Sequence, residues 1–141
     1  MTARTGRCLC GAVTFELTAE PLVTRVCWCR DCQHLAANGT VNLLVPAEAL
    51  VVSGALSEHT KKAGSGNQVT RQFCPGCGTH LFARSSGFPQ FRVVRIGNLD
   101  EPSSVRPRLN IWASSAPKWA CLDPTLERVE HQSAPPRQPS T

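Results

Sequence analysis

Cysteine is the residue type in this sequence with the greatest capacity for chemistry, and most copies lie in tight groups. The chain has eight cysteines among 141 residues. They form three short clusters, Cys8-Leu9-Cys10, Cys27-Trp28-Cys29-Arg30-Asp31-Cys32 and Cys74-Pro75-Gly76-Cys77, with Cys121 standing apart. The sequence shows no apolar stretch typical of a secretory signal, so we expect a cytoplasmic protein whose thiols stay reduced. Clustered, reduced thiols predict metal binding rather than disulfide bonds.

The pair Cys74 and Cys77 has the spacing of a zinc knuckle. Two intervening residues let both sulfurs face one ion, and the glycines in this segment tolerate the turn between them. A structural zinc ion needs four ligands, and Cys8 and Cys10 are the natural second pair. We therefore predict a structural zinc site of Cys8, Cys10, Cys74 and Cys77, the alternative being ordinary buried thiols.

The third cluster, Cys27, Cys29 and Cys32, offers three thiolates and leaves the fourth position of a tetrahedral zinc ion open. Open sites are typical of catalytic zinc, because water or substrate takes the fourth position. Two alternatives remain: His34 or Cys121 closes the site, or the cluster is a metal-free redox centre. If a helix begins in this cluster, Cys32 and His34 point to different faces, which favours the open site.

A zinc ion held by three thiolates favours a substrate that is itself a thiol. Three thiolates leave the centre with a net charge of about −1, so it polarises water less than a three-histidine centre does. A soft fourth ligand suits it better, and glutathione is the dominant small thiol of the cytosol. Arg25 and Arg30 could offset the negative charge of the centre, or could simply be solvated.

The elements that position these thiols are predicted to be short strands with little helix. Residues 11–18 alternate, with Val13, Phe15 and Leu17 on one face, as in a half-buried strand. A helix of about two turns is expected from Asp31 to Ala37, capped by the Asp31 carboxylate. Further strands are expected at residues 22–26, 40–45, 57–61, 69–73, 81–84, 91–96 and 109–113.

Length and composition predict a single, mainly β domain. We expect it to span residues 1–130, because residues 131–141 lack large apolar side chains and contain three prolines, which predicts a disordered tail. The formal net charge is +5, but the basic residues are dispersed, so nucleic acid is not an expected partner. No apolar run is long enough for a membrane span, so we expect no membrane partner.

Several other residues have both a functional and a structural interpretation. Trp28 could line a pocket beside the open zinc position or fill the core. Arg92 and Lys118 are candidates for binding a substrate carboxylate, although most such side chains are solvated. Trp112 and Trp119 are expected in the core or in the pocket wall.

Five motifs, taken in order, resemble the glutathione-dependent formaldehyde-activating family, which shares a domain with centromere protein V. The resemblance covers roughly residues 6–130. The motifs are G-x-C-x-C-G-A-V-x-F (6–15), C-x-C-x-x-C (27–32), F-C-P-x-C-G-T-H-L-F (73–82), G-N-L-D-x-P (97–102) and A-P-K-W (116–119).

The resemblance implies an Mss4-like β fold of short antiparallel strands that holds two zinc ions. Cys8, Cys10, Cys74 and Cys77 would hold the structural ion, and Cys27, Cys29 and Cys32 the catalytic one. The family reaction joins glutathione and formaldehyde into S-(hydroxymethyl)glutathione, formally a carbon–sulfur lyase run in reverse. Trp28 stands where members commonly have histidine, and Gln33-His34 stands where they have basic residues.

The leading hypothesis is therefore a zinc enzyme of this type, acting on glutathione or a related thiol and its aldehyde adduct. The alternative is a zinc-stabilised module that binds a thiol or a macromolecule without turnover, for which the net charge of +5 is the support. Methionine sulfoxide reduction on the related fold normally uses two C-x-x-C pairs. The C-x-C spacing of the first pair here counts against it.

Overall fold

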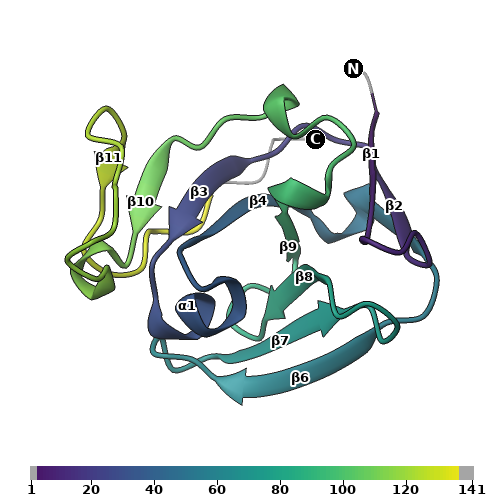
Figure 1. Cartoon of the computed structure of the whole chain (residues 1–141), viewed down its shortest axis with the longest axis horizontal. Helices are drawn as coiled ribbons and strands as arrows, with labels where there is room; N and C mark the ends of the chain where they lie inside the picture. The colour runs from purple at the N-terminus through teal and green to yellow at the C-terminus, as the bar shows by residue number, and fades with distance from the viewer. Residues whose placement is uncertain (1–2, 137–141) are drawn as a thin grey trace.

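The computed structural model describes residues 3–136 and consists mainly of strands in two sheets (Figure 1). The small sheet has the order β1-β2-β5 and is antiparallel. The large sheet has the order β11-β10-β3-β4-β9-β8-β7-β6. This architecture confirms the predicted mainly β fold of short strands with little helix. The small sheet contains β1 (Arg4–Arg7), β2 (Thr14–Leu17) and β5 (Leu50–Ser53).

The large sheet is antiparallel except at β10, which runs parallel to both β3 and β11. Its strands are β3 (Val23–Cys27), β4 (Thr40–Pro46), β6 (Ser57–Lys62), β7 (Gln68–Phe73), β8 (His80–Ser85), β9 (Phe91–Arg95), β10 (Leu109–Ile111) and β11 (Glu127–Arg128). Single 3₁₀ turns connect several strands, at Ala47–Ala49, Ile96–Asn98, Pro102–Ser104 and Ala113–Ser115. The long connection after β9 carries the chain back across the molecule, which allows β10 to enter in the parallel direction.

The main hydrophobic core lies between the two sheets. As the alternation predicted, Val13, Phe15 and Leu17 are buried together, and the ring of Phe15 meets that of Phe82 edge to face at 5.2 Å. Phe82 lies on β8, so this contact joins the small sheet to the large one. The thiols of Cys8 and Cys74 are part of the same buried cluster.

The helix α1 (Arg30–Ala36) begins one residue earlier than expected and is capped differently. The Cys29 thiol, not the Asp31 carboxylate, accepts the hydrogen bond from the Cys32 amide, at 3.4 Å. The helix ends at Ala37, which adopts a left-handed conformation with φ of 58°. Asp31 is thereby free to pair with basic side chains of the large sheet, which curves around α1 (Figure 1).

Three strands were not anticipated from the sequence: β1, β5 and β11. β1 consists of Arg-Thr-Gly-Arg, which has no alternating apolar pattern, and it forms because it pairs with β2. Tertiary pairing has overridden local preference here. Within residues 3–136, no helix is long and apolar enough to cross a membrane.

Gly6 allows β1 to lie close against the core beside the first cysteine pair. A Cβ atom at this position would overlap the Phe15 ring and the carbonyl oxygen of Asn98. We expect Gly6→Ala to lower the free energy of unfolding by about 1–3 kcal/mol, because a backbone oxygen cannot move aside cheaply. Urea unfolding measures this loss.

Gly97→Ala is the matched control, since a Cβ there meets no atom within 4 Å. We expect it to change stability by less than about 0.5 kcal/mol. Equal losses for the two variants would contradict the close approach at Gly6.

Candidate functional site

The structure brings together the four cysteines that were predicted to share one ion. Cys8 and Cys10 follow β1, and Cys74 and Cys77 lie in the turn between β7 and β8. All four sulfurs lie within 4.8 Å of one another, with 3.6 Å between Cys8 and Cys10 and 3.7 Å between Cys10 and Cys74. Sulfurs around a tetrahedral zinc ion with normal Zn–S bonds lie about 3.8 Å apart. The spacing of this group therefore fits a metal ion.

The backbone of both loops is fixed so that the sulfurs converge. The Cys8 amide donates to the Val13 carbonyl at 3.0 Å, and the Gly78 amide donates to the Cys74 carbonyl at 2.8 Å. Gly78 has a φ of +75°, a conformation that residues with a side chain rarely adopt. These hydrogen bonds close two tight turns, and the cysteine sulfurs of the two turns lie next to one another.

The thiols of this four-cysteine cluster do not ionise equally. The Thr79 hydroxyl, at 3.1 Å, lowers the pKa of Cys77 to about 5. The Ala12 amide lowers the pKa of Cys10, but the neighbouring thiols outweigh it and raise that pKa to about 11. Four adjacent negative charges repel one another, so complete ionisation requires a cation among them.

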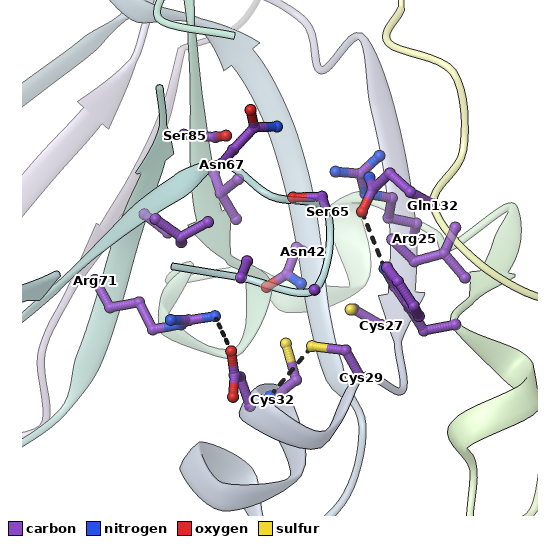
Figure 2. Close-up of a pocket in the computed structure, with 18 of the residues that line it drawn as sticks. Arg25, Cys27, Cys29, Cys32, Asn42, Ser65, Asn67, Arg71, Ser85 and Gln132 are labelled. Atoms are coloured by element: carbon purple, nitrogen blue, oxygen red, sulfur yellow. Dashed lines mark hydrogen bonds and ion pairs between the residues drawn. The ribbon is translucent and has the colours of Figure 1, made fainter. Parts of the chain in front are cut away.

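The second group consists of Cys27, Cys29 and Cys32, called here the trio. Cys27 ends β3, Cys29 caps α1 and Cys32 lies in the first turn of α1; their sulfurs also lie within 4.8 Å of one another (Figure 2). His34 and Cys121 are both exposed, and neither belongs to the group. Among residues 3–136, no fourth cysteine, histidine or carboxylate joins the trio.

The trio shows the same electrostatic conflict more strongly because it is buried. Hydrogen bonds from the thiols of Cys27 and Cys29, assisted by the charge of Arg95, lower the pKa of Cys32 to about 2. Hydrogen bonding to Cys29 and the charge on Cys32 raise the pKa of Cys27 far above its ordinary value. The Cys32 thiol therefore ionises readily, whereas the Cys27 thiol does not. A dication bound by all three would remove this conflict, so the donor set fits a metal ion.

The trio opens into a cavity of about 440 Å³ whose floor is one face of the large sheet. Arg25 on β3, Asn42 on β4 and Arg95 on β9 are directly paired across the strands and form a polar row on this floor. Farther from the trio the floor is apolar, with Leu44, Val69, Ala83, Phe91 and Val93. The cavity therefore offers a charged end beside the thiols and an apolar end beyond them.

The remaining walls come from segments far apart in the sequence. Ser65 and Asn67, from the β6–β7 loop, lie above the trio in Figure 2. The ring of Trp112 lies beside this loop, since a Cβ atom at Gly64 would be 3.5 Å from it. Trp112 has a strained left-handed conformation, with φ of 53°. Its indole Nε1 donates to the Gln132 side chain at 3.0 Å. The C-terminal segment thus holds one wall of the cavity in place.

Residues 131–133, expected as the start of a disordered tail, contact the cavity wall. The His131 ring meets Trp112 edge to face at 5.5 Å, and Arg25 donates to the Ser133 hydroxyl at 3.0 Å. These contacts could not be predicted from the sequence, because residues 131–133 are polar and show no periodicity. The rest of the expected tail includes residues 137–141, which lie outside the described part of the chain.

The structure also separates the other candidate residues. Trp28 is buried and donates from Nε1 to the Asn110 side chain at 3.0 Å, so it fills the core and does not line the cavity. Trp112 is a wall residue as expected, whereas Trp119 is 67% exposed and is not. Neither Arg92 nor Lys118 lines the cavity. The cavity arginines that sequence reasoning missed are Arg71, Arg84 and Arg95.

Arg92 and Arg95 illustrate why the sequence could not select the right arginine. Both lie on β9, but successive side chains of a strand point to opposite faces. Arg92 hydrogen-bonds to the Pro89 and Phe91 carbonyls at 3.0 and 2.9 Å, away from the cavity. Which face of β9 carries the cavity is decided by its pairing with β4 and β8.

A mainly β domain with one cluster of four cysteines and one of three defines a class of protein suited to holding metal ions. The family model described as "Glutathione-dependent formaldehyde-activating enzyme" matches residues 3–115. The match covers more than half of the chain, which therefore belongs to this family, as its motifs indicated.

A solved structure provides a second comparison. The crystal structure of a Rhodobacter sphaeroides protein, a structural genomics target, is similar, with a TM-score of 0.56 and 26% sequence identity. The match covers 74% of this chain and 92% of that chain. No curated protein matches.

The two clusters should differ in their effect on stability when metal is bound. Cys74 joins two distant parts of the core, so we expect Cys74→Ser to cost at least about 2 kcal/mol more than Cys29→Ser. A serine at position 29 can still cap α1, since its hydroxyl accepts the same amide hydrogen bond. Urea unfolding of zinc-loaded protein measures both.

Cys121→Ser serves as the control, because Cys121 is exposed and belongs to neither cluster. Its stability should equal that of the unchanged protein. Comparable losses for Cys74→Ser and Cys29→Ser would argue against one structural and one functional cluster.

Proposed function

We propose that this chain is a zinc-dependent enzyme of the S-(hydroxymethyl)glutathione synthase type, a carbon–sulfur lyase acting on a small thiol and its aldehyde adduct. The observation that carries this proposal is the trio, which has three convergent thiols and opens into a cavity large enough for a small molecule. Membership of the glutathione-dependent formaldehyde-activating family supports the same reaction class.

The two clusters would have different roles. Cys8, Cys10, Cys74 and Cys77 would hold a structural zinc ion, because four thiolates complete its coordination and two of them, Cys8 and Cys74, lie in the core. Cys27, Cys29 and Cys32 would hold the catalytic zinc ion. When bound there, zinc would supply positive charge that favours the thiolate form of a substrate thiol.

The chemistry on the substrates is an addition without any change of oxidation state. The substrate sulfur forms a bond to the aldehyde carbon, and the electron pair of the carbonyl π bond moves to oxygen. The thiol loses its proton and the oxygen gains one, so atoms and charge balance. The reverse reaction breaks the same carbon–sulfur bond and releases both compounds.

The side chains around the trio would bind and orient these substrates. Arg25 and Arg95 are close enough to the trio for its thiolates to raise the pKa of each guanidinium, although burial lowers both values overall. Both guanidinium groups therefore lie close to the thiolates of the trio and stabilise their negative charge. The walls formed by Trp112 and the β6–β7 loop limit water at the thiols, which strengthens these interactions.

The state of the thiols suits a cytoplasmic location, which we propose for this reaction. All eight cysteines are free within the described part of the chain. Reduced thiols persist in the cytoplasm, where glutathione is also present.

The proposal requires two zinc ions per chain. Native mass spectrometry at saturating zinc should show two ions for the unchanged protein and for Cys121→Ser. The Cys29→Ser variant should bind one zinc ion tightly, in the four-cysteine cluster. The two thiolates that remain in the trio hold zinc less well than four thiolates do. One ion on the unchanged protein would contradict the two-site assignment.

Thiol binding at the trio should release a proton. Calorimetry of zinc-loaded protein in buffers of different ionisation enthalpy should detect this proton with glutathione and not with its serine analogue. We expect the analogue to bind at least tenfold more weakly, about 1.4 kcal/mol, because an oxygen ligand is poorly matched to the site.

Equal affinity for glutathione and its serine analogue would contradict the proposed thiol chemistry. Proton-coupled binding without turnover of the adduct, followed by NMR, would instead favour a binding module.

A further inference from the structure

The cavity above the trio carries an excess of positive charge that the addition reaction alone does not require. Six basic residues line it, although Arg84, next to Ala83 on β8, points its side chain to the other face of the sheet, toward Glu58; among the described residues Asp31 is the single carboxylate in the lining. Asp31 and Glu58, which is outside the lining, can neutralise only part of this charge. The six are Arg25, Arg30, Lys61, Arg71, Arg84 and Arg95.

The available carboxylates are already engaged. Asp31 binds Lys61 at 2.6 Å and lies 3.6 Å from Arg71. Glu58 binds Arg84 at 3.4 Å. Even with a zinc ion in the trio, whose net charge with three thiolates is about −1, about three positive charges have no partner. This charge is an energetic cost in the empty cavity and an attraction for an anion.

Two of these arginines are buried with unused hydrogen-bond donors. Arg71 is only 7% exposed, and its Nε has no hydrogen-bond partner among the described residues. The Nε of Arg95 is also buried and lacks a partner there, although its Nη1 donates to Asn42 at 2.6 Å. Buried guanidinium donors normally have partners, and carboxylates match their geometry best. The protein therefore leaves both guanidinium groups incompletely satisfied, and their positive charge beside the cavity attracts an anionic ligand.

The basic groups flank the trio on two sides. In Figure 2, Arg71 lies on one side of the three sulfurs and Arg25 on the other. Arg71 comes from β7, whereas Arg25 comes from β3 and is fixed by the Ser133 hydroxyl. A ligand whose sulfur reaches the trio could therefore place one acidic group on each side of that sulfur.

A ligand ammonium group would find no free carboxylate in this cavity. Asp31, the only carboxylate that residues 3–136 contribute to the lining, is held by Lys61 and Arg71. Glutathione carries two carboxylates and one ammonium group. Its carboxylates match the two basic sides, but its ammonium group would lie in a field of positive charge.

We propose that the preferred ligand is a thiol, or its aldehyde adduct, with two acidic groups flanking the sulfur and no ammonium group. The inference rests on the proposed function for the place of the sulfur, and on the basic cavity for the charge of the ligand. The apolar floor around Leu44, Phe91 and Val93 accommodates the carbon chain between the charged groups.

Four ligands separate the two parts of this proposal. They are glutathione, glutaryl-cysteinyl-glycine (which lacks only the ammonium group), and the serine counterpart of each. Dissociation constants are measured by calorimetry on zinc-loaded full-length protein. We expect the thiol without the ammonium group to bind at least tenfold more tightly than glutathione, and the serine pair to show the same preference.

Three variants locate the effect. Arg71→Gln should weaken glutaryl-cysteinyl-glycine at least fivefold. Arg92→Gln, on the other face of the sheet, is the matched control and should leave the affinity unchanged. Asp31→Asn removes the one carboxylate that the described residues contribute to the lining, and it should not weaken the binding of glutathione. Zinc content and melting temperature verify that each variant is folded.

The outcomes are distinguishable. The inference would be overturned if glutaryl-cysteinyl-glycine bound less than tenfold more tightly than glutathione. It would also be overturned if Asp31→Asn by itself lowered the affinity for glutathione fivefold. A sulfur effect without an ammonium effect would leave the proposed function standing and overturn only the charge preference. An ammonium effect without a sulfur effect would support the charge preference and contradict the proposed function.

Discussion

Negative charge on crowded sulfur atoms is the constraint around which this molecule is arranged. Thiols that converge within hydrogen-bonding distance cannot all ionise unless positive charge is placed among or beside them. In the four-cysteine cluster the sulfurs are spaced as they are around one metal ion, and two of them, those of Cys8 and Cys74, lie in the core. In the trio, positive charge also comes from the neighbouring strands, through Arg25 and Arg95. The two clusters therefore differ in their surroundings, because only the trio lines the cavity.

The large sheet contacts both clusters because one of its faces packs in the core and the other forms the floor of the cavity. Alternate residues of β4, such as Leu43 and Val45, point into the core between the sheets. The intervening residues, Asn42 and Leu44, form the floor of the cavity. A strand covered on both faces cannot show a simple alternation of apolar and polar residues. The register with β3 and β9 then aligns Arg25, Asn42 and Arg95 in one row beside the thiols.

Local spacing was sufficient to predict the parts of the site that lie close together in the chain. A C-x-x-C turn and the C-x-C-x-x-C segment bring their own sulfurs together, and the grouping of Cys8 and Cys10 with Cys74 and Cys77 followed from ligand number. The alternation around Phe15 likewise identified a core strand. The helix cap was misassigned because a carboxylate is the commoner cap, whereas here the Cys29 thiol accepts the amide.

The cavity could not be predicted in the same way, since its charge depends on which strands pair. Arg71 and Arg95 become neighbours of the trio only through the order β4-β9-β8-β7 in the large sheet. The wall at Trp112 depends on a polar segment at residues 131–133 that has no pattern of its own. The close spacing within each cysteine motif is therefore encoded locally, whereas the lining of the cavity is assembled by topology. Two chains with the same cysteine motifs can then share an ion and a reaction class while binding ligands of different charge.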